Sequence, residues 1–208
     1  MNPLEIYNSI YNYIEEDSII CDLHSACKNG KYLCGQISSN KKVLNFDAVS
    51  CNWCKAQKVS NKKSVDVITT SYSNNYFCFI ELKTWELVLN NPKNKKSDVK
   101  ESDIENQAKK YESDLPKKLT NSIETCKQIN TNNDLFDNCK IIFILVTDIS
   151  VNDDGISNIY LNRTALAGTS SDLKKLCNQL SKNIMNNIPN IETHYWHCKD
   201  FDTNLSKL

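Results

Sequence analysis

Residues 78–85 read Cys-Phe-Ile-Glu-Leu-Lys-Thr-Trp, an apolar β-strand pattern interrupted by a carboxylate, Glu81, and an ammonium, Lys83. Successive side chains of a strand point to opposite faces, so Glu81 and Lys83 share one face and Leu82 points into the other layer. Ionised groups are rarely buried without a partner, a metal ion or water. The pair therefore indicates either a functional cleft at a strand end or the solvated face of an edge strand.

A β-hairpin is predicted to bring a second carboxylate to this pair. The runs 65–70 and 76–81 are rich in β-branched and aromatic residues, and the polar cluster 71–75 between them is typical of a turn. Asp66 opens the first strand and Glu81 closes the second. Antiparallel pairing of the two strands then brings both carboxylates to the same end of the sheet.

These residue types are sufficient for metal-assisted hydrolysis. Two carboxylates, Asp66 and Glu81, and a strand-end backbone oxygen, the Leu82 carbonyl, are the hard oxygen ligands that Mg²⁺ or Mn²⁺ prefers. Lys83 beside such an ion is suited to orient or deprotonate an attacking water, while the ion polarises a phosphodiester. We therefore expect a divalent-metal site for phosphodiester hydrolysis.

Periodicity along the rest of the chain predicts an α/β fold, in which helices flank a central mixed β-sheet. Besides the hairpin, the expected elements in chain order are a helix at 3–16, a strand at 42–51, one long helix at 102–129, a strand at 140–147 buried on both faces, a short strand at 157–161, a helix at 170–187 and a strand at 192–197. An interruption of the long helix at Pro116 is the alternative. The length suits a single domain, 1–208, with a cysteine-bearing irregular insertion at 21–54 and a C-terminal extension at 148–208.

The composition indicates a cytoplasmic protein with no global attraction to polyanions. The 25 basic and 25 acidic residues balance, so any site for nucleic acid must be local. The start of the chain has no signal-peptide pattern, and no run of about 18 apolar residues predicts a membrane span. We therefore expect a reducing compartment, no membrane contact and mostly free thiols among the 10 cysteines.

The hairpin motif resembles that of the PD-(D/E)xK nuclease superfamily, in which an acidic residue at a strand start is followed, across a hairpin, by Glu-x-Lys. The matching segments are Val-Asp-Val-Ile at 65–68 and Phe-Ile-Glu-Leu-Lys-Thr at 79–84, with Val65 in place of the family's proline. The resemblance covers residues 3–147 and implies a restriction-endonuclease-like core with the element order αβββαβ. It also implies that the two acids bind the metal and that the lysine positions the water.

A second motif resembles the RecB-like branch of this superfamily. Gln-Ala-Lys-Lys-Tyr at 107–111 fits the QxxxY pattern that these members carry on the helix after Glu-x-Lys. Gln107 and Tyr111 are i, i+4 neighbours on one helix face. The resemblance implies that they contact DNA or order the metal-bound water. Tyr111 also continues the apolar stripe of its helix, so packing is the alternative role.

Other carboxylates compete for the site. Asp47 is an alternative to Asp66 as the first motif acid, but its separation from Glu81 is longer than a simple hairpin allows. We therefore favour Asp66 and expect Asp47 nearby at most. Glu15 or Glu16 of the first helix is a further candidate ligand, for which surface charge is the alternative.

The cysteines allow a zinc site. Cys51 and Cys54 have the CxxC spacing of a zinc knuckle, and Cys27 and Cys34 would complete four ligands for Zn²⁺. A single CxxC is a weak signal, and buried free thiols are the favoured alternative.

Lysines flank the hairpin in two polar loops. Lys62 and Lys63 precede it, and Lys95 and Lys96 follow it. Phosphate contacts from lysine add salt-sensitive affinity without reading sequence. We expect these lysines to bind a nucleic acid backbone, with solvated loop charges as the alternative.

Together these features predict a Mg²⁺-dependent nuclease, with DNA favoured over RNA as its substrate. A chain of this length has no separate recognition domain, so a protein partner or a second copy is expected to supply targeting, as in an effector subunit of an antiviral-defence or repair system. The alternative with a different kind of function is a non-catalytic module of the same fold, which binds protein or nucleic acid and is stabilised by zinc.

Overall fold

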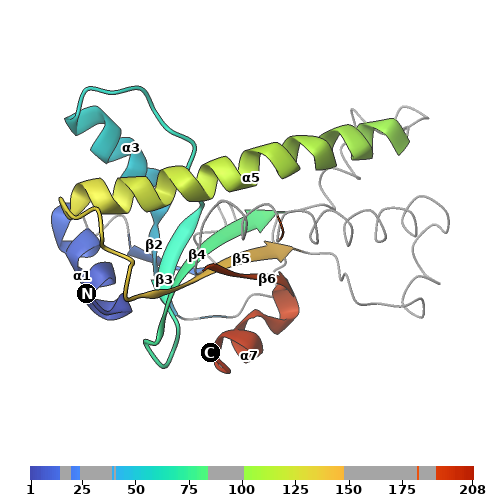
Figure 1. Ribbon diagram of the computed structural model, residues 1–208. Helices are drawn as coiled ribbons and strands as arrows, with labels where there is room; N and C mark the ends of the chain where they lie inside the picture. The colour runs from blue at the N-terminus through green and yellow to red at the C-terminus, as the bar shows by residue number, and fades with distance from the viewer. Residues whose placement is uncertain (15–19, 24–38, 40, 84–100, 148–181, 183–190) are drawn as a thin grey trace.

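The computed structural model describes residues 1–14, 20–23, 39, 41–83, 101–147, 182 and 191–208, and of residues 14 and 101–112 it describes the backbone alone (Figure 1). In chain order the described elements are α1 (Pro3–Ile14), β1 (Ile20–Asp22), β2 (Lys42–Asn45), α3 (Phe46–Ala56), β3 (Val67–Thr70), β4 (Tyr76–Lys83), α5 (Glu101–Ile129), β5 (Lys140–Thr147), β6 (Ile191–His197), the 3₁₀ helix η3 (Cys198–Asp200) and α7 (Phe201–Leu205).

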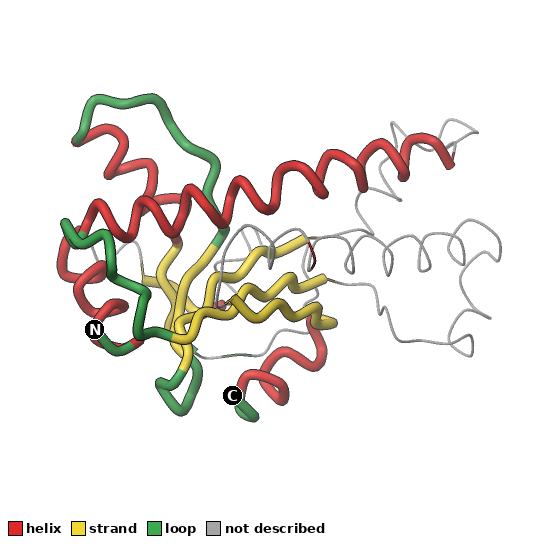
Figure 2. The backbone as a smooth tube through the Cα atoms, viewed as in Figure 1, coloured by secondary structure: helices red, strands yellow, loops and turns green. Residues whose placement is uncertain are grey.

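The six described strands form one mixed sheet in the order β1-β2-β3-β4-β5-β6 (Figure 2). Neighbours from β1 to β4 pair antiparallel, whereas β4 with β5 and β5 with β6 pair in parallel. A parallel neighbour needs a crossover connection, and α5 follows β4 in the chain and crosses one face of the sheet before β5 (Figure 1). The predicted α/β class, a central mixed sheet flanked by helices, is therefore confirmed.

Side chains alternate along the strands and build a core on each face of the sheet. On the face covered by α1 and α5, the central strands contribute Phe79 and Phe143. On the opposite face Ile80 and Ile144 pack with Phe201 of α7. Position 81 follows Phe79 by two residues and therefore faces α5. In the described ranges no helix is long and apolar enough to cross a membrane.

The prediction of a strand at 42–51 is confirmed for Lys42–Asn45 and wrong for the residues after Asn45. β2 ends at Asn45 and the chain continues as α3. Asn45 caps the new helix, because its Oδ1 accepts a hydrogen bond from the Ala48 amide at 3.2 Å. The buried residues of α3 are Phe46, Val49, Ser50, Trp53 and Cys54.

Two further expectations need correction. The described part of the segment 21–54 is regular, because β1 pairs antiparallel with β2 and α3 follows. The alternative of an interruption at Pro116 is also wrong, since α5 continues through it. Leu115 and Leu119, which flank the proline, are buried against the sheet, and this packing offsets the hydrogen bond that proline removes.

The predicted elements at 157–161 and 170–187 lie outside the described residues, except for Lys182, which is helical. Glu15 and Glu16 also lie outside them. The helix predicted from residue 3, the hairpin, and the strands predicted at 140–147 and 192–197 are confirmed as α1, β3 with β4, β5 and β6.

Replacing Asn45 with alanine is expected to lower the free energy of unfolding by about 1 kcal/mol, because the first turn of α3 loses its side-chain cap. Urea unfolding followed by circular dichroism measures this loss. Asn61→Ala is the control, since Asn61 is exposed and outside any helix or strand. Equal stability of the two variants would mean that the cap does not hold α3.

Candidate functional site

Asp66 and Glu81 meet where the hairpin ends. Val67 pairs with Ile80 across the two strands, so Asp66, one residue earlier, comes opposite Glu81. Asp66 Oδ2 also accepts a hydrogen bond from the Leu82 amide at 2.7 Å. The structure thus brings together the two carboxylates that the sequence pattern paired. The observed contact of Leu82 is through its amide N–H, whereas the predicted metal ligand was its carbonyl.

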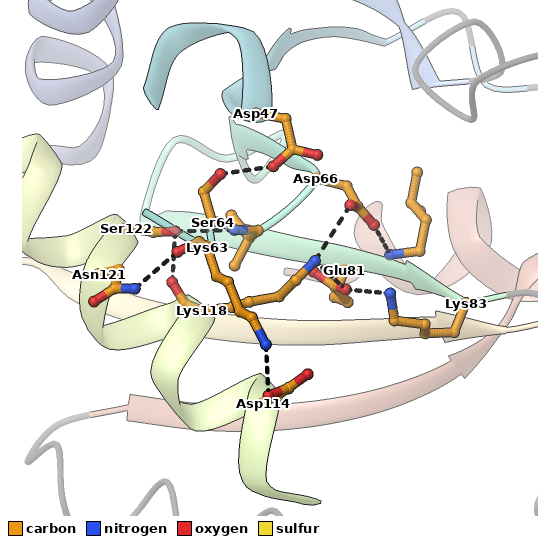
Figure 3. Close-up of polar contacts among 12 residues, drawn as sticks. Asp47, Lys63, Ser64, Asp66, Glu81, Lys83, Asp114, Lys118, Asn121 and Ser122 are labelled. Carbon is orange, nitrogen blue, oxygen red and sulfur yellow. Dashed lines mark hydrogen bonds and ion pairs between the residues drawn. The ribbon is translucent and has the colours of Figure 1, made fainter. Parts of the chain in front are cut away.

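Two lysines converge on Glu81 (Figure 3). Lys83 Nζ lies 2.5 Å from Glu81 Oε1, as expected for two residues on the same face of one strand. Lys118 Nζ, from α5, donates to the same Oε1 at 2.7 Å and lies 3.7 Å from Asp66 Oδ1. Glu81 is fully buried, while the side chains of Lys83, Lys118 and Asp66 are 20%, 18% and 23% exposed. The cluster of charged side chains is therefore partly exposed to solvent at the two lysines and Asp66.

Lys118 is the site residue that the sequence pattern did not identify. It lies between Leu115 and Leu119, which belong to the apolar stripe of α5. A lysine next to such a stripe was the available signal, but lysines often lay their stems along apolar surface and keep the ammonium in water. The signal was therefore too common to single out Lys118.

The environment raises the pKa of Glu81 to about 7. Burial is the largest cause, because it penalises the ionised form, and the negative charge of Asp66 adds to it. Lys83 and Lys118 act in the opposite direction by stabilising the carboxylate. Glu81 Oε2 is buried and has no hydrogen-bond partner in the described part of the chain. The carboxylate therefore keeps one oxygen uncommitted inside the site.

Hydrogen bonds join the segment before β3 to α5. The Val65 amide donates to Ser122 Oγ at 3.0 Å, and Asn121 Nδ2 donates to the Lys63 carbonyl at 3.0 Å. Ser122 Oγ in turn donates to the backbone carbonyl of Lys118 at 2.7 Å. These contacts fix Asp66 relative to the helix that supplies Lys118 (Figure 3).

Asp47 lies beside the site in the first turn of α3. Its Oδ1 accepts a hydrogen bond from Ser64 Oγ at 2.6 Å, and the neighbouring Phe46 amide donates to the Asp66 carbonyl at 2.9 Å. Figure 3 shows Asp47 next to Asp66, on the side away from Glu81. Asp66 thus contacts the Glu-x-Lys strand directly, through the Leu82 amide.

Gln107 and Tyr111 lie in α5, but their side chains fall outside the described part. They precede Lys118 by 11 and 7 residues, which corresponds to about 16 and about 10 Å along the helix axis. In Figure 1 this half of α5 extends past the ends of β4 and β5. Among the described side chains of α5, Lys118 meets the carboxylates, and the roles of Gln107 and Tyr111 stay predictions.

Of the four lysines predicted to bind a nucleic acid backbone, the structure describes Lys62 and Lys63. Lys62 Nζ lies over the Trp53 ring at 5.2 Å, and Lys63 Nζ forms an ion pair with Asp114 Oδ1 at 2.9 Å. Exposed contacts of this kind contribute little, so a phosphate can replace them at small cost. Lys95 and Lys96 lie outside the described residues.

The cysteine site is only partly described. Cys51 and Cys54 lie on α3 with free thiols, and Cys54 is buried in the core. Cys27 and Cys34 lie outside the described residues, so the zinc prediction stays untested. Cys198 forms a disulfide, while the other described cysteines, Cys21, Cys51, Cys54, Cys78, Cys126 and Cys139, are free.

The donor set at Asp66 and Glu81 fits a hard divalent cation. Glu81 Oε2 is buried and uncommitted, and Asp66 Oδ1 has an ammonium at 3.7 Å as its described neighbour. Within the described ranges no three His, Cys, Asp or Glu side chains gather as a metal-binding group. Mg²⁺ is nevertheless commonly held by one or two carboxylates together with water and substrate phosphate. Two carboxylates therefore suffice for Mg²⁺ or Mn²⁺.

Comparison of the chain with family models, curated proteins and solved structures found no match.

The metal-free protein is expected to lose stability as the pH rises from the ordinary pKa of Glu81 to its pKa in the folded state. The folded pKa, about 7, lies above the ordinary value of 4.5, so the folded state binds more protons between these values. The free energy of unfolding should fall by up to about 3 kcal/mol between about pH 4.5 and about pH 7. Above this range it should level off. Glu81→Gln lacks this contribution.

Urea unfolding of both proteins in chelator, at several pH values, measures the effect. The difference between wild type and Glu81→Gln isolates Glu81, because the other titrating groups are common to both. A difference that does not change with pH would contradict the assignment of the raised pKa to Glu81.

Proposed function

We propose that the protein is a metal-dependent nuclease of the PD-(D/E)xK type, which hydrolyses phosphodiester bonds of nucleic acid, with DNA favoured over RNA. Asp66 and Glu81 bind Mg²⁺ or Mn²⁺, and Lys83 positions the attacking water. The main support is the meeting of the two acids at the carboxyl end of β4, where Glu81 Oε2 is buried with no partner among the described residues.

Each residue has a separate task in this proposal. The bound ion supplies Lewis-acid polarisation of the phosphodiester. The Leu82 amide holds Asp66 Oδ2, which leaves Oδ1 directed toward the site. Glu81 Oε1 anchors Lys83 Nζ, so that the ammonium is fixed where it can orient a water by hydrogen bonding. Burial of Glu81 excludes bulk water from one side of the pair.

The arrangement of elements also supports the proposal. The elements α1, β2, β3, β4, α5 and β5 follow one another in the order αβββαβ, with β1 and α3 added. The candidate site lies at the carboxyl end of β4, next to its parallel neighbour β5. In α/β sheets this edge is where ligands commonly bind.

The substrate and partners belong to the same proposal. Lys62 and Lys63 precede Asp66 in the chain, and with Lys95 and Lys96 they are assigned to the nucleic acid backbone. Charge balance over the whole chain makes these local contacts the source of affinity. We assign targeting to a protein partner or a second copy, in a cytoplasmic defence or repair system.

A non-catalytic binding module is the second candidate, and one observation favours it. Glu81 Oε1 already forms ion pairs with the ammonium groups of Lys83 and Lys118, and such an arrangement also occurs in purely structural ion networks. In that case the acids and lysines would hold β4 to α5 without chemistry.

Cleavage of a substrate panel separates the two candidates. Linear and circular DNA and RNA, single- and double-stranded, are incubated with the full chain in Mg²⁺, in Mn²⁺ or in chelator. The nuclease proposal expects cleavage of at least one substrate that stops in chelator. No cleavage of any substrate with either metal, or equal cleavage in chelator, would contradict it.

A further inference from the structure

We propose that Lys118 is a built-in counter-ion of the Asp66–Glu81 pair: its ammonium occupies the cation position in the metal-free protein and leaves it when a divalent ion binds. This inference rests on the proposed function and adds a means of regulating the same site. The loaded and unloaded states then differ in where one side chain of α5 lies.

The first argument is the position of the Lys118 ammonium. Nζ is 2.7 Å from Glu81 Oε1 and 3.7 Å from Asp66 Oδ1, so it contacts both carboxylates (Figure 3). These are the two groups that would hold a divalent ion. A cation within ion-pair distance of both acids is therefore in competition with any metal that uses the same oxygens.

The second argument is the balance of charge. In the metal-free site two carboxylates face two ammoniums, those of Lys83 and Lys118. A divalent cation added to this arrangement would leave an excess of two positive charges around a buried glutamate. Like charges at such distances repel strongly where water is scarce. At least one ammonium must then move away.

Lys118 is the ammonium that moves. Lys83 pairs with Thr147 of β5 at the end of β4, and the proposed function keeps its ammonium beside the attacking water. Lys118 reaches the site from α5 on a flexible four-carbon stem, and its side chain is 18% exposed. Its ammonium can therefore turn to water without any change in the sheet.

The matched pair Lys118→Met and Lys117→Met tests the inference. Both variants remove one positive charge from neighbouring positions of α5, but Lys117 is exposed and its Nζ lies 3.4 Å from Ser113 Oγ. Mn²⁺ binding to each full-length protein is measured by electron paramagnetic resonance of the free ion. We expect Lys118→Met to bind Mn²⁺ about tenfold more tightly than wild type, and Lys117→Met to bind like wild type.

Amine labelling of the wild-type protein gives a second measurement that needs no variant to fold. The modification rate of Lys118 is followed by mass spectrometry with and without saturating Mn²⁺. We expect Mn²⁺ to speed modification of Lys118 severalfold and to leave that of Lys63, which pairs with Asp114, unchanged. An unchanged rate at Lys118 would overturn the inference.

The outcomes distinguish the inference from the function on which it rests. Equal Mn²⁺ affinity of wild type and Lys118→Met overturns the counter-ion role and leaves the metal site in place. Failure of every variant to bind Mn²⁺ at millimolar concentrations overturns both. Binding by Lys118→Met alone supports the counter-ion role in its strongest form.

Discussion

Glu81→Gln is expected to lower the rate of metal-dependent cleavage by on the order of 10³-fold or more. Glutamine has nearly the same shape as glutamate, so it fills the same fully buried space. It cannot carry the negative charge that holds a divalent cation and anchors Lys83 and Lys118. Loss of the ion removes several kcal/mol of transition-state stabilisation, which corresponds to this factor.

Initial rates on the cleaved substrate, measured in Mg²⁺ and Mn²⁺, test this expectation. Glu124→Gln is the matched control, because Glu124 is an exposed glutamate of α5 whose Oε1 accepts from Gln128. We expect the control to cleave like wild type. Cleavage by Glu81→Gln at more than about a tenth of the wild-type rate would remove Glu81 from the metal site.

Lys83→Met is expected to lower kcat by about 10²–10⁴-fold with little change in KM, because the proposed function assigns the ammonium to the attacking water and not to substrate binding. Methionine keeps most of the apolar stem of lysine at the end of β4, so packing is largely retained. The side chain is 20% exposed, and its removal leaves Lys118 as a partner of Glu81.

Steady-state kinetics of Lys83→Met and of Lys42→Met measure the effect. Lys42 is an exposed lysine of β2 on the same sheet, and its substitution controls for the loss of one positive charge. If Lys83→Met raised KM and kept kcat, Lys83 would bind the substrate backbone instead of orienting water.

The sheet and the carboxylate pair were predictable because they depend on local patterns. The runs that became β3 and β4 are rich in β-branched and aromatic residues around a polar turn, and β5 is a continuous apolar run buried on both faces. Once the hairpin is accepted, the period of two places Glu81 and Lys83 on one face, and strand pairing brings Asp66 to them.

The start of α3 was not predictable from hydrophobic pattern alone. Apolar and polar residues alternate over 44–48 as in a strand, and Asn45 fits both a strand end and a helix N-cap. What decides is tertiary structure, because Phe46 and Val49 are buried in the core against the sheet. Local preference is weak where a few residues support both states, and burial then selects one of them.

Lys118 was missed because its role depends on a long-range contact. It is separated from Glu81 by 37 residues in the chain, and its place next to the apolar stripe of α5 is too common a signal to identify it. The choice is made by the face of α5 that packs on the sheet, which Leu115 and Leu119 mark in the folded core. Charged partners contributed from a crossover helix are therefore harder to predict than pairs within one hairpin.

Anomalous diffraction from crystals equilibrated with Mn²⁺ locates the ion itself. We expect an anomalous peak between the carboxylates of Asp66 and Glu81, with the Lys118 ammonium turned away, and no such peak in Asp66→Asn. A protein that binds Mn²⁺ elsewhere, or a saturated crystal with no peak at these two acids, would contradict this expectation.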